Sequence, residues 1–187
     1  MAFRALTVPR GVEAKNLPLV VDIHGGPHVH GFSWGFNETA QFLASRGYAV
    51  LQPNFRGSGG FGATFAQAGY RQWGRKMQDD VTDAVQYAIR SGLANAGRIC
   101  IVGAGYGGYA ALMGAVKTPD LYRCAVSLGG VTNLPELVSD SRWYLNQKPL
   151  VEMRIGSWWS DRERLRETSP VFHAQEMRTP LLLMHGF

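Results

Sequence analysis

The stretch Arg98–Leu112 constrains the fold of this chain more than any other segment. It joins an apolar run, typical of a buried strand, to a glycine-rich turn and a run of helix-forming residues. One interpretation takes Gly103, Gly105 and Gly108 as G-x-G-x-x-G, a turn whose amides and helix N-terminus hold a pyrophosphate. Another takes Gly103 and Gly107 as the frame of G-x-S-x-G, the nucleophile elbow of hydrolases, with Gly105 in place of the serine. The two interpretations imply incompatible functions, and they differ in the residue that they require at position 105.

The nucleotide interpretation requires an acidic residue at the end of the following strand, about 20 positions on, to bind the ribose hydroxyls. The next strand that the sequence predicts, residues 122–128, runs into Gly129 and has no acid at its end. Asp120 precedes that strand and so lies at its opposite end. The sequence therefore disfavours a nucleotide-binding protein.

The elbow interpretation predicts a second element upstream, a strand ending in a glycine loop that supplies an oxyanion-hole amide. Residues 19–23 form an apolar strand candidate, and His24-Gly25-Gly26-Pro27 follows it directly. Any tight loop after a buried strand can use Gly-Gly-Pro, so the loop alone does not decide between the two functions. The loop and the elbow together, in this order, favour the hydrolase.

Composition fits one globular domain, since 45% of the 187 residues are hydrophobic and 18% are charged. The formal charge of +5 comes mainly from arginine, but the arginines of residues 152–167 alternate with acids, as on a solvated, ion-paired helix face. We therefore expect no nucleic-acid partner. No apolar run reaches membrane-spanning length and residues 1–6 lack the apolar core of a signal peptide, so we expect a cytoplasmic chain without a membrane partner.

The two cysteines and the histidines suggest no cofactor. Cys100 and Cys124 each fall in an apolar strand candidate, where we expect them to pack as small hydrophobic thiols without a disulfide. His28 and His30 alternate on an extended segment, but a metal site requires a third ligand at matching spacing. We expect neither a metal nor an organic cofactor.

Strands alternate with helices along the chain, which predicts an α/β fold with a mostly parallel, doubly wound sheet. Between residues 53 and 62 lies a glycine-rich loop, and residues 130–175 suggest loops and short helices. Strands are predicted at residues 3–8, 19–23, 48–52, 98–102, 122–128 and 180–186, and helices at 37–46, 79–90 and 106–117.

Four motifs in this order resemble the peptidase domain of the prolyl oligopeptidase family of serine peptidases, with its acylaminoacyl-peptidase and dipeptidyl-peptidase-like branches nearest. They are residues 24–27 (HGGP), 54–58 (NFRGS), 103–110 (GAGYGGYA) and 179–186 (TPLLLMHG). The resemblance implies an α/β-hydrolase fold that cleaves short peptides through an acyl-enzyme, with a β-propeller usually in front. We expect residues 1–187 to form a single domain of this kind, incomplete at its C-terminus and without the propeller.

The sequence departs from the family pattern at the catalytic residues. Gly105 stands where the family has its serine, and a glycine has no oxygen that can attack a carbonyl. The family pattern places the acid and the histidine beyond His185-Gly186, and the sequence ends at Phe187. Loss of any one triad member removes most catalysis, so the resemblance implies an inactive chain. The alternative is a non-catalytic module that binds a peptide in the same cleft.

The resemblance also implies other site residues. Backbone amides of Tyr106 and Gly26 would form the oxyanion hole. Arg56, Leu134 and Trp143 are candidates for substrate binding, although Arg56 can equally pin its own loop and the other two can be ordinary packing residues. We interpret His173 as structural and expect the exposed strand edge at residues 181–184 to favour homo-oligomers.

Overall fold

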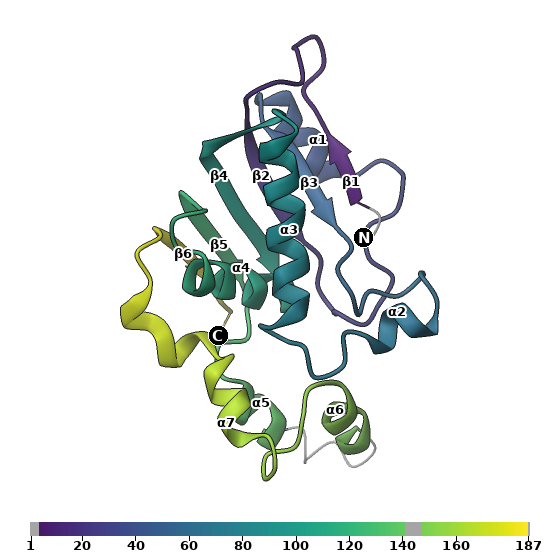
Figure 1. Ribbon diagram of the computed structural model, residues 1–187, viewed down its shortest axis with the longest axis vertical. Coiled ribbons are helices and arrows are strands. Elements are labelled where there is room, and N and C mark those ends of the chain that lie inside the picture. Colours follow the sequence, from purple (N-terminus) through teal and green to yellow (C-terminus); the bar gives the residue numbers. More distant parts are fainter. Residues whose placement is uncertain (1–3, 141–146, 187) are drawn as a thin grey trace.

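The computed structural model describes residues 4–140 and 147–186, which form an α/β-hydrolase fold around a six-stranded sheet of order β1-β3-β2-β4-β5-β6 (Figure 1). Every neighbouring pair is parallel except β1 with β3, which is antiparallel. The strands are β1 (Arg4–Thr7), β2 (Leu17–Ile23), β3 (Ala49–Pro53), β4 (Ala94–Ala104), β5 (Cys124–Leu128) and β6 (Leu181–Met184).

Helices cover both faces of this sheet, because parallel strands need crossover connections. Helices α3 and α4 contact each other and lie in front of the sheet, while α1 lies behind it (Figure 1). The helices are α1 (Glu38–Ser45), α2 (Ala63–Gln67), α3 (Lys76–Arg90), α4 (Tyr106–Lys117), α5 (Leu134–Asp140), α6 (Lys148–Arg154), α7 (Arg162–Glu167) and the 3-10 helix η2 (Pro170–Glu176). No helix among the described residues is long and apolar enough to cross a membrane.

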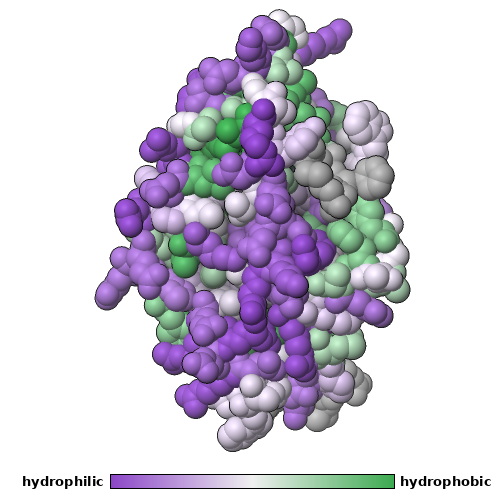
Figure 2. Space-filling model, viewed as in Figure 1, coloured by the Kyte–Doolittle hydropathy of each residue, from purple (hydrophilic) through white to green (hydrophobic). Residues whose placement is uncertain are grey.

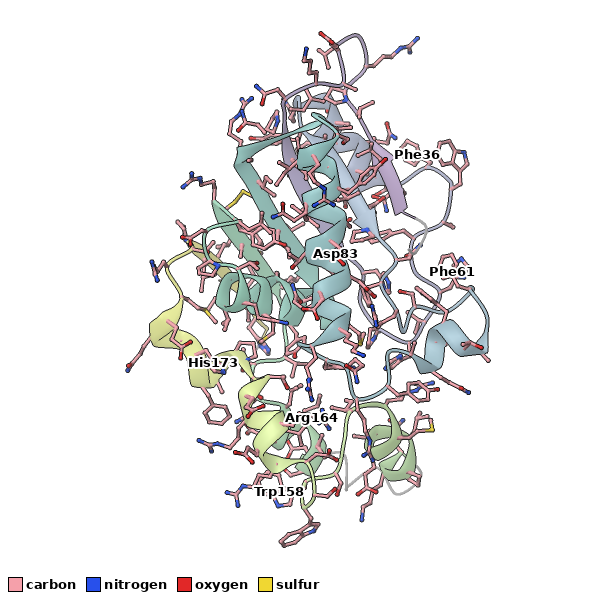
Figure 3. All side chains as sticks on the ribbon, viewed as in Figure 1. Phe36, Phe61, Asp83, Trp158, Arg164 and His173 are labelled. Atoms are coloured by element: carbon pink, nitrogen blue, oxygen red, sulfur yellow. A yellow bond between two sulfur atoms is a disulfide. The ribbon has the colours of Figure 1, made fainter. Side chains whose placement is uncertain are left out.

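Local sequence signals account for most of these elements. The side chain of Asn37 accepts a hydrogen bond from the Ala40 amide (2.9 Å) and so caps α1 where the sequence predicts a helix start. Helix α4 begins and ends at the predicted residues. Helix α3 is three residues longer at its start than the predicted 79–90. Its buried face includes Val81 and Val85, whereas its outward face, with Asp83, is hydrophilic (Figures 2 and 3).

The core lies between the central strands and α4. Ile99 and Ile101 of β4 are fully buried beneath α4, whose Tyr109 is also fully buried. A side chain on Gly114 of α4 would come within 3.0 Å of the Tyr122 ring. Small residues on α4, such as Gly114, therefore let this helix approach the sheet closely.

The cysteines correct one sequence expectation. Cys100 and Cys124 face each other in register on the parallel strands β4 and β5, with their Cα atoms 4.7 Å apart, and form a disulfide. The expectation of two free thiols is therefore wrong. It treated each strand alone, whereas pairing of β4 with β5 brings the two sulfur atoms within bonding reach.

The strand β6 forms one edge of the sheet and exposes all its side chains, from 37% for Leu181 to 63% for Leu183. An exposed apolar edge offers unpaired backbone groups to another chain. We therefore predict that the isolated 187-residue polypeptide self-associates, and that Leu183→Lys shifts it toward monomer because a charge disfavours edge pairing. Sedimentation at several concentrations tests this. A monomeric parent polypeptide with a sharp, cooperative melt would contradict the prediction.

Candidate active site

Gly105 lies at the apex of a sharp turn between β4 and α4. Its backbone angles are φ 57° and ψ −119°, a left-handed conformation that favours glycine. Its N–H donates to the carbonyl of Leu128 at the end of β5 (2.9 Å), and its carbonyl accepts from the Tyr109 amide in α4 (3.1 Å). Hydrogen bonds to a strand and to a helix therefore fix the apex from both sides.

The flanking glycines are required by packing, whereas Gly105 is not. A side chain on Gly103 would meet the backbone of Gly107, and one on Gly107 would meet the carbonyl oxygen of Ile23. At Gly105 the same atom would have nothing within 4 Å. This pattern is that of a nucleophile elbow, in which two glycines permit the turn and the central residue projects into open space.

The two segments predicted to form the oxyanion hole lie beside each other. Strands β2 and β4 are neighbours with Ile23 opposite Gly103, so the loop after β2 is adjacent to the elbow. A side chain on Gly25 would come within 3.3 Å of the Ala104 carbonyl oxygen. Tyr106 is the first residue of α4, where an N–H has no acceptor within the helix and the helix dipole favours negative charge. This arrangement is compatible with amides of Gly26 and Tyr106 as oxyanion donors, a role that remains a prediction.

The side chain of Tyr106 belongs to a buried aromatic cluster next to the elbow. Its ring lies 4.6 Å from the Trp73 ring, 5.4 Å from Phe55 and 5.5 Å from Tyr109, between centroids. Burial raises the pKa of the Tyr106 hydroxyl far above its usual value, so the group is neutral at physiological pH. The cluster therefore acts as a rigid support for the first turn of α4.

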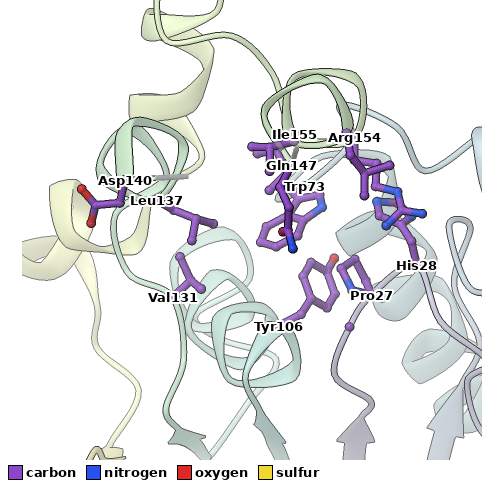
Figure 4. Close-up of a pocket in the computed structure, with 13 residues that line it drawn as sticks. Pro27, His28, Trp73, Tyr106, Val131, Leu137, Asp140, Gln147, Arg154 and Ile155 are labelled. Carbon is purple, nitrogen blue, oxygen red and sulfur yellow. The ribbon is translucent and has the colours of Figure 1, made fainter. Parts of the chain in front are cut away.

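A cavity of about 400 Å³ opens above the elbow (Figure 4). Tyr106 and the Gly26–Pro27 loop lie at one side of it, and α6 lies at the other. The walls are mostly apolar and include Val131, Leu137, Leu150, Val151 and Ile155. Its size and composition suit a small ligand or part of a peptide.

Ser58 and His24 form a pair that the sequence did not reveal. Nε2 of His24 lies 2.8 Å from Oγ of Ser58, which also donates to the Phe55 carbonyl (2.7 Å). Burial lowers the pKa of the His24 imidazole, and its ring stacks on Phe55 with centroids 4.5 Å apart. Because Ser58 is fully buried, it cannot reach a substrate, and this pair holds the two glycine-rich loops together.

Arg56 has a partner that favours the loop-pinning interpretation. Its Nε and Nη2 donate to the two carboxylate oxygens of Asp80 in α3 (2.8 and 2.6 Å), and its backbone N–H donates to the same carboxylate (2.8 Å). The partner is thus a carboxylate from a neighbouring helix and not a carbonyl of its own loop. Arg56 does not line the cavity.

The other predicted side chains lie in different environments. Leu134 is fully buried in the core, and Leu137, one helical turn on, lines the cavity instead. Trp143 lies outside the described residues. His173 contacts Glu176 (3.2 Å) and the Glu167 carbonyl (2.9 Å) and does not line the cavity (Figure 3), which is compatible with a structural residue.

The cavity is also lined by His28, Trp73 and Arg154, to which the sequence interpretation gave no part in substrate binding. Arg154 was expected on a solvated, ion-paired helix face, whereas its Nε is buried at the cavity. His28 stood out only as a possible metal ligand, but residues 4–140 and 147–186 contain no group of three His, Cys, Asp or Glu side chains that could hold a metal ion. Trp73 and Arg154 belong to no motif. Only the tertiary fold brings them to the elbow.

A G-x-x-x-G elbow between a central parallel strand and its helix, with a glycine loop on the neighbouring strand, defines the serine-hydrolase class of α/β-hydrolases. Residues 34–187 match the model of the prolyl oligopeptidase family, and the chain belongs to this family of serine peptidases.

Curated relatives cover most of this chain. Dipeptidyl aminopeptidase BIII of Pseudoxanthomonas mexicana is 40% identical over 97% of the chain and 28% of its own length. Dipeptidyl peptidase family member 6 of Caenorhabditis elegans is 39% identical over 90% of the chain and 23% of its own length. The chain thus spans about a quarter of the length of these relatives.

Solved structures of peptidases have the same fold. A puromycin-hydrolyzing peptidase of Mycobacterium tuberculosis matches with a TM-score of 0.86 and 27% identity, covering 96% of this chain and 28% of that one. The acylaminoacyl peptidase of Pyrococcus horikoshii matches with a TM-score of 0.84 and 28% identity, covering 97% and 29%. These likenesses agree with the fold built from the elbow and the sheet order.

Proposed function

We propose that this chain is a serine-peptidase domain that positions a peptide at the elbow but cannot form an acyl-enzyme. The observation that carries the proposal is the apex at Gly105, where the backbone has the elbow conformation and space for a side chain is open, but no nucleophilic oxygen is present. The proposal depends on position 105 alone and applies whatever surrounds the domain.

The chemistry of the class explains why this one position decides activity. A serine oxygen at the apex bonds to the carbonyl carbon of the peptide, its proton passes to a histidine, and the carbonyl oxygen becomes an oxyanion. We assign oxyanion stabilisation to the amides of Tyr106 and Gly26. With glycine at position 105 the first bond cannot form, so only peptide binding and the oxyanion donors remain.

The cavity supports the peptide-binding part of this proposal. Its apolar walls next to the elbow offer a surface to a peptide side chain even when no bond is cleaved. Calorimetry with short peptides, combined with chromatographic analysis of the recovered ligand, distinguishes intact binding from hydrolysis.

We predict that Gly105→Ser alone does not turn the 187-residue polypeptide into a peptidase. The new hydroxyl needs a histidine to take its proton and an acid to orient that histidine. Nε2 of His24 contacts Ser58, and Nδ1 of His28 contacts the Gly57 carbonyl and not a carboxylate. Hydrolysis of an aminoacyl anilide should stay near background, and a fluorophosphonate probe should label the variant slowly. Rapid, stoichiometric labelling would show that a residue within the polypeptide acts as base and would refute this account of the site.

A further inference from the structure

Buried polar atoms without a partner gather at the cavity above the elbow. Among the described residues, Nε2 of His28, Nε1 of Trp73 and Nε of Arg154 are buried and make no hydrogen bond, and all three residues line this cavity. The remaining atoms of this kind belong to Gln78 and Tyr122. Buried polar groups in folded proteins are almost always paired, so such a cluster requires a ligand or water to complete it. Two of the three atoms, on Trp73 and Arg154, are obligate donors.

Arg154 is held in place by its backbone, and its guanidinium has no ion-pair partner among residues 4–140 and 147–186. Its carbonyl accepts from the Arg71 amide (2.7 Å), and the carbonyl of Ile155 accepts from Nη2 of Arg164 (2.9 Å). These bonds fix the end of α6.

Asp140, the acidic residue among the described ones that line the cavity, does not form an ion pair with Arg154. Asp140 lines the opposite side, and Figure 4 shows its carboxylate turned away from the guanidinium. Figure 4 also shows the indole nitrogen of Trp73 on the side of its ring that faces His28 and Arg154. The cavity therefore presents a cation and a second donor on the same side, which is the recognition chemistry of a carboxylate.

His28 adds an acceptor next to these donors. Its Nδ1 lies 3.1 Å from the Gly57 carbonyl oxygen, which can only accept, so we assign the hydrogen to Nδ1 and leave Nε2 as an acceptor in the neutral ring. Burial, and then the charge of Arg154, lower the pKa of His28. The His28 and Tyr70 rings are perpendicular, with their centroids 5.3 Å apart. A neutral His28 suits an N–H group of the ligand.

We propose that this cavity selects peptides that carry a carboxylate, with Arg154 and Trp73 as its donors and His28 as the acceptor of a neighbouring peptide N–H. The inference rests on the proposed function, because it takes the cavity as the peptide site. The apolar remainder of the cavity then holds an adjoining aliphatic side chain. The carboxylate belongs either to an acidic side chain or to the C-terminus of the peptide, and the experiment separates these sources.

Isothermal calorimetry with three acetylated tripeptides tests the proposal on the protein as it stands. The first is Ac-Ala-Leu-Gln-amide, without a carboxylate. The second is Ac-Ala-Leu-Glu-amide, with only a side-chain carboxylate, and the third is Ac-Ala-Leu-Gln with a free C-terminus. We expect one of the two carboxylate peptides to bind about tenfold more tightly than the neutral peptide, as for a charge-assisted hydrogen bond. This difference in affinity should shrink at high salt.

Variants assign the preference to its residues. Arg154→Gln should abolish the preference while the neutral peptide still binds, and Trp73→Phe should reduce it by about two- to threefold because one donor is lost. Arg90→Gln, at the C-terminal end of α3, removes the same charge outside the cavity and should leave the preference intact. Melting curves of each variant identify any that fail to fold, and Arg154→Lys then provides a second test, since a point charge cannot reproduce the planar fork.

The possible results separate the two proposals. Equal binding of all three peptides to the parent protein would overturn the carboxylate inference and leave the peptide site intact. A preference that survives in Arg154→Gln would also overturn it. Failure of every peptide to bind would overturn the peptide-binding function itself, together with the inference that rests on it.

Discussion

Turnover is expected to differ by about a million-fold between two chimeric peptidases that differ only at position 105, the loss seen when a catalytic triad is disabled. In both, residues 1–187 of this chain replace the matching segment of dipeptidyl aminopeptidase BIII, which is 40% identical over that segment and supplies the rest of the enzyme. The chimera with Gly105 should be inactive, and the Gly105→Ser chimera should hydrolyse a dipeptidyl anilide with a burst of acylation. The open space at Gly105 admits the hydroxyl without displacing any neighbour.

Gly105→Ala is the matched control for this pair. It introduces the same Cβ atom and the same backbone penalty as serine but no oxygen, so the Ala chimera should remain as inactive as the parent. Circular dichroism checks that the three chimeras fold alike. Full activity of the Gly105 chimera would mean that a residue other than the one at the apex attacks the substrate, and would end the assignment of the elbow as the nucleophile position.

Glycine at the apex also has an energetic consequence. A non-glycine residue held at φ 57° and ψ −119° stores about 1–3 kcal/mol of backbone strain, which an active elbow tolerates for the sake of its geometry. With glycine, the same turn is free of that strain. Loss of the nucleophile is therefore expected to stabilise the fold, which is the usual direction of the trade between stability and activity.

The framework of this fold could be predicted from sequence because its signals are local. Apolar strand runs, the Asn37 cap and the spacing of Val81 and Val85 each depend on neighbours a few residues apart. The elbow was readable because sterics demand glycine at both Gly103 and Gly107.

The rest depended on contacts between distant segments. Arg56 and Asp80 are 24 positions apart, and Cys100 and Cys124 meet only because β4 and β5 pair in that register. The sequence leaves Leu134 as a candidate either for substrate binding or for ordinary packing. The orientation of α5 turns Leu134 into the core and leaves Leu137 at the cavity. A sequence pattern marks such residues as apolar or charged and cannot say which partner each one meets.

The frame of the elbow makes a separate prediction about stability, with a larger effect than any change at the apex. We expect Gly107→Ala to lower the free energy of unfolding by about 3 kcal/mol or more, since its methyl group would overlap the Ile23 carbonyl at the end of β2, where backbone cannot move without breaking the sheet. Gly105→Ala should cost less, about 1–3 kcal/mol, the penalty for a non-glycine residue in this backbone conformation with no clash.

Urea denaturation of both variants, in the chimeric host if the isolated polypeptide self-associates, measures this difference. Equal losses at the two positions would mean that the close approach of α4 to β2 is not fixed. The amides of Tyr106 and Gly26, which we propose as oxyanion donors, would then have no rigid relation to each other. The contact between Gly107 and Ile23 joins the first turn of α4 to the strand that carries the Gly26 loop. A large loss at Gly107 alone would instead support a preorganised elbow that persists although its nucleophile is absent.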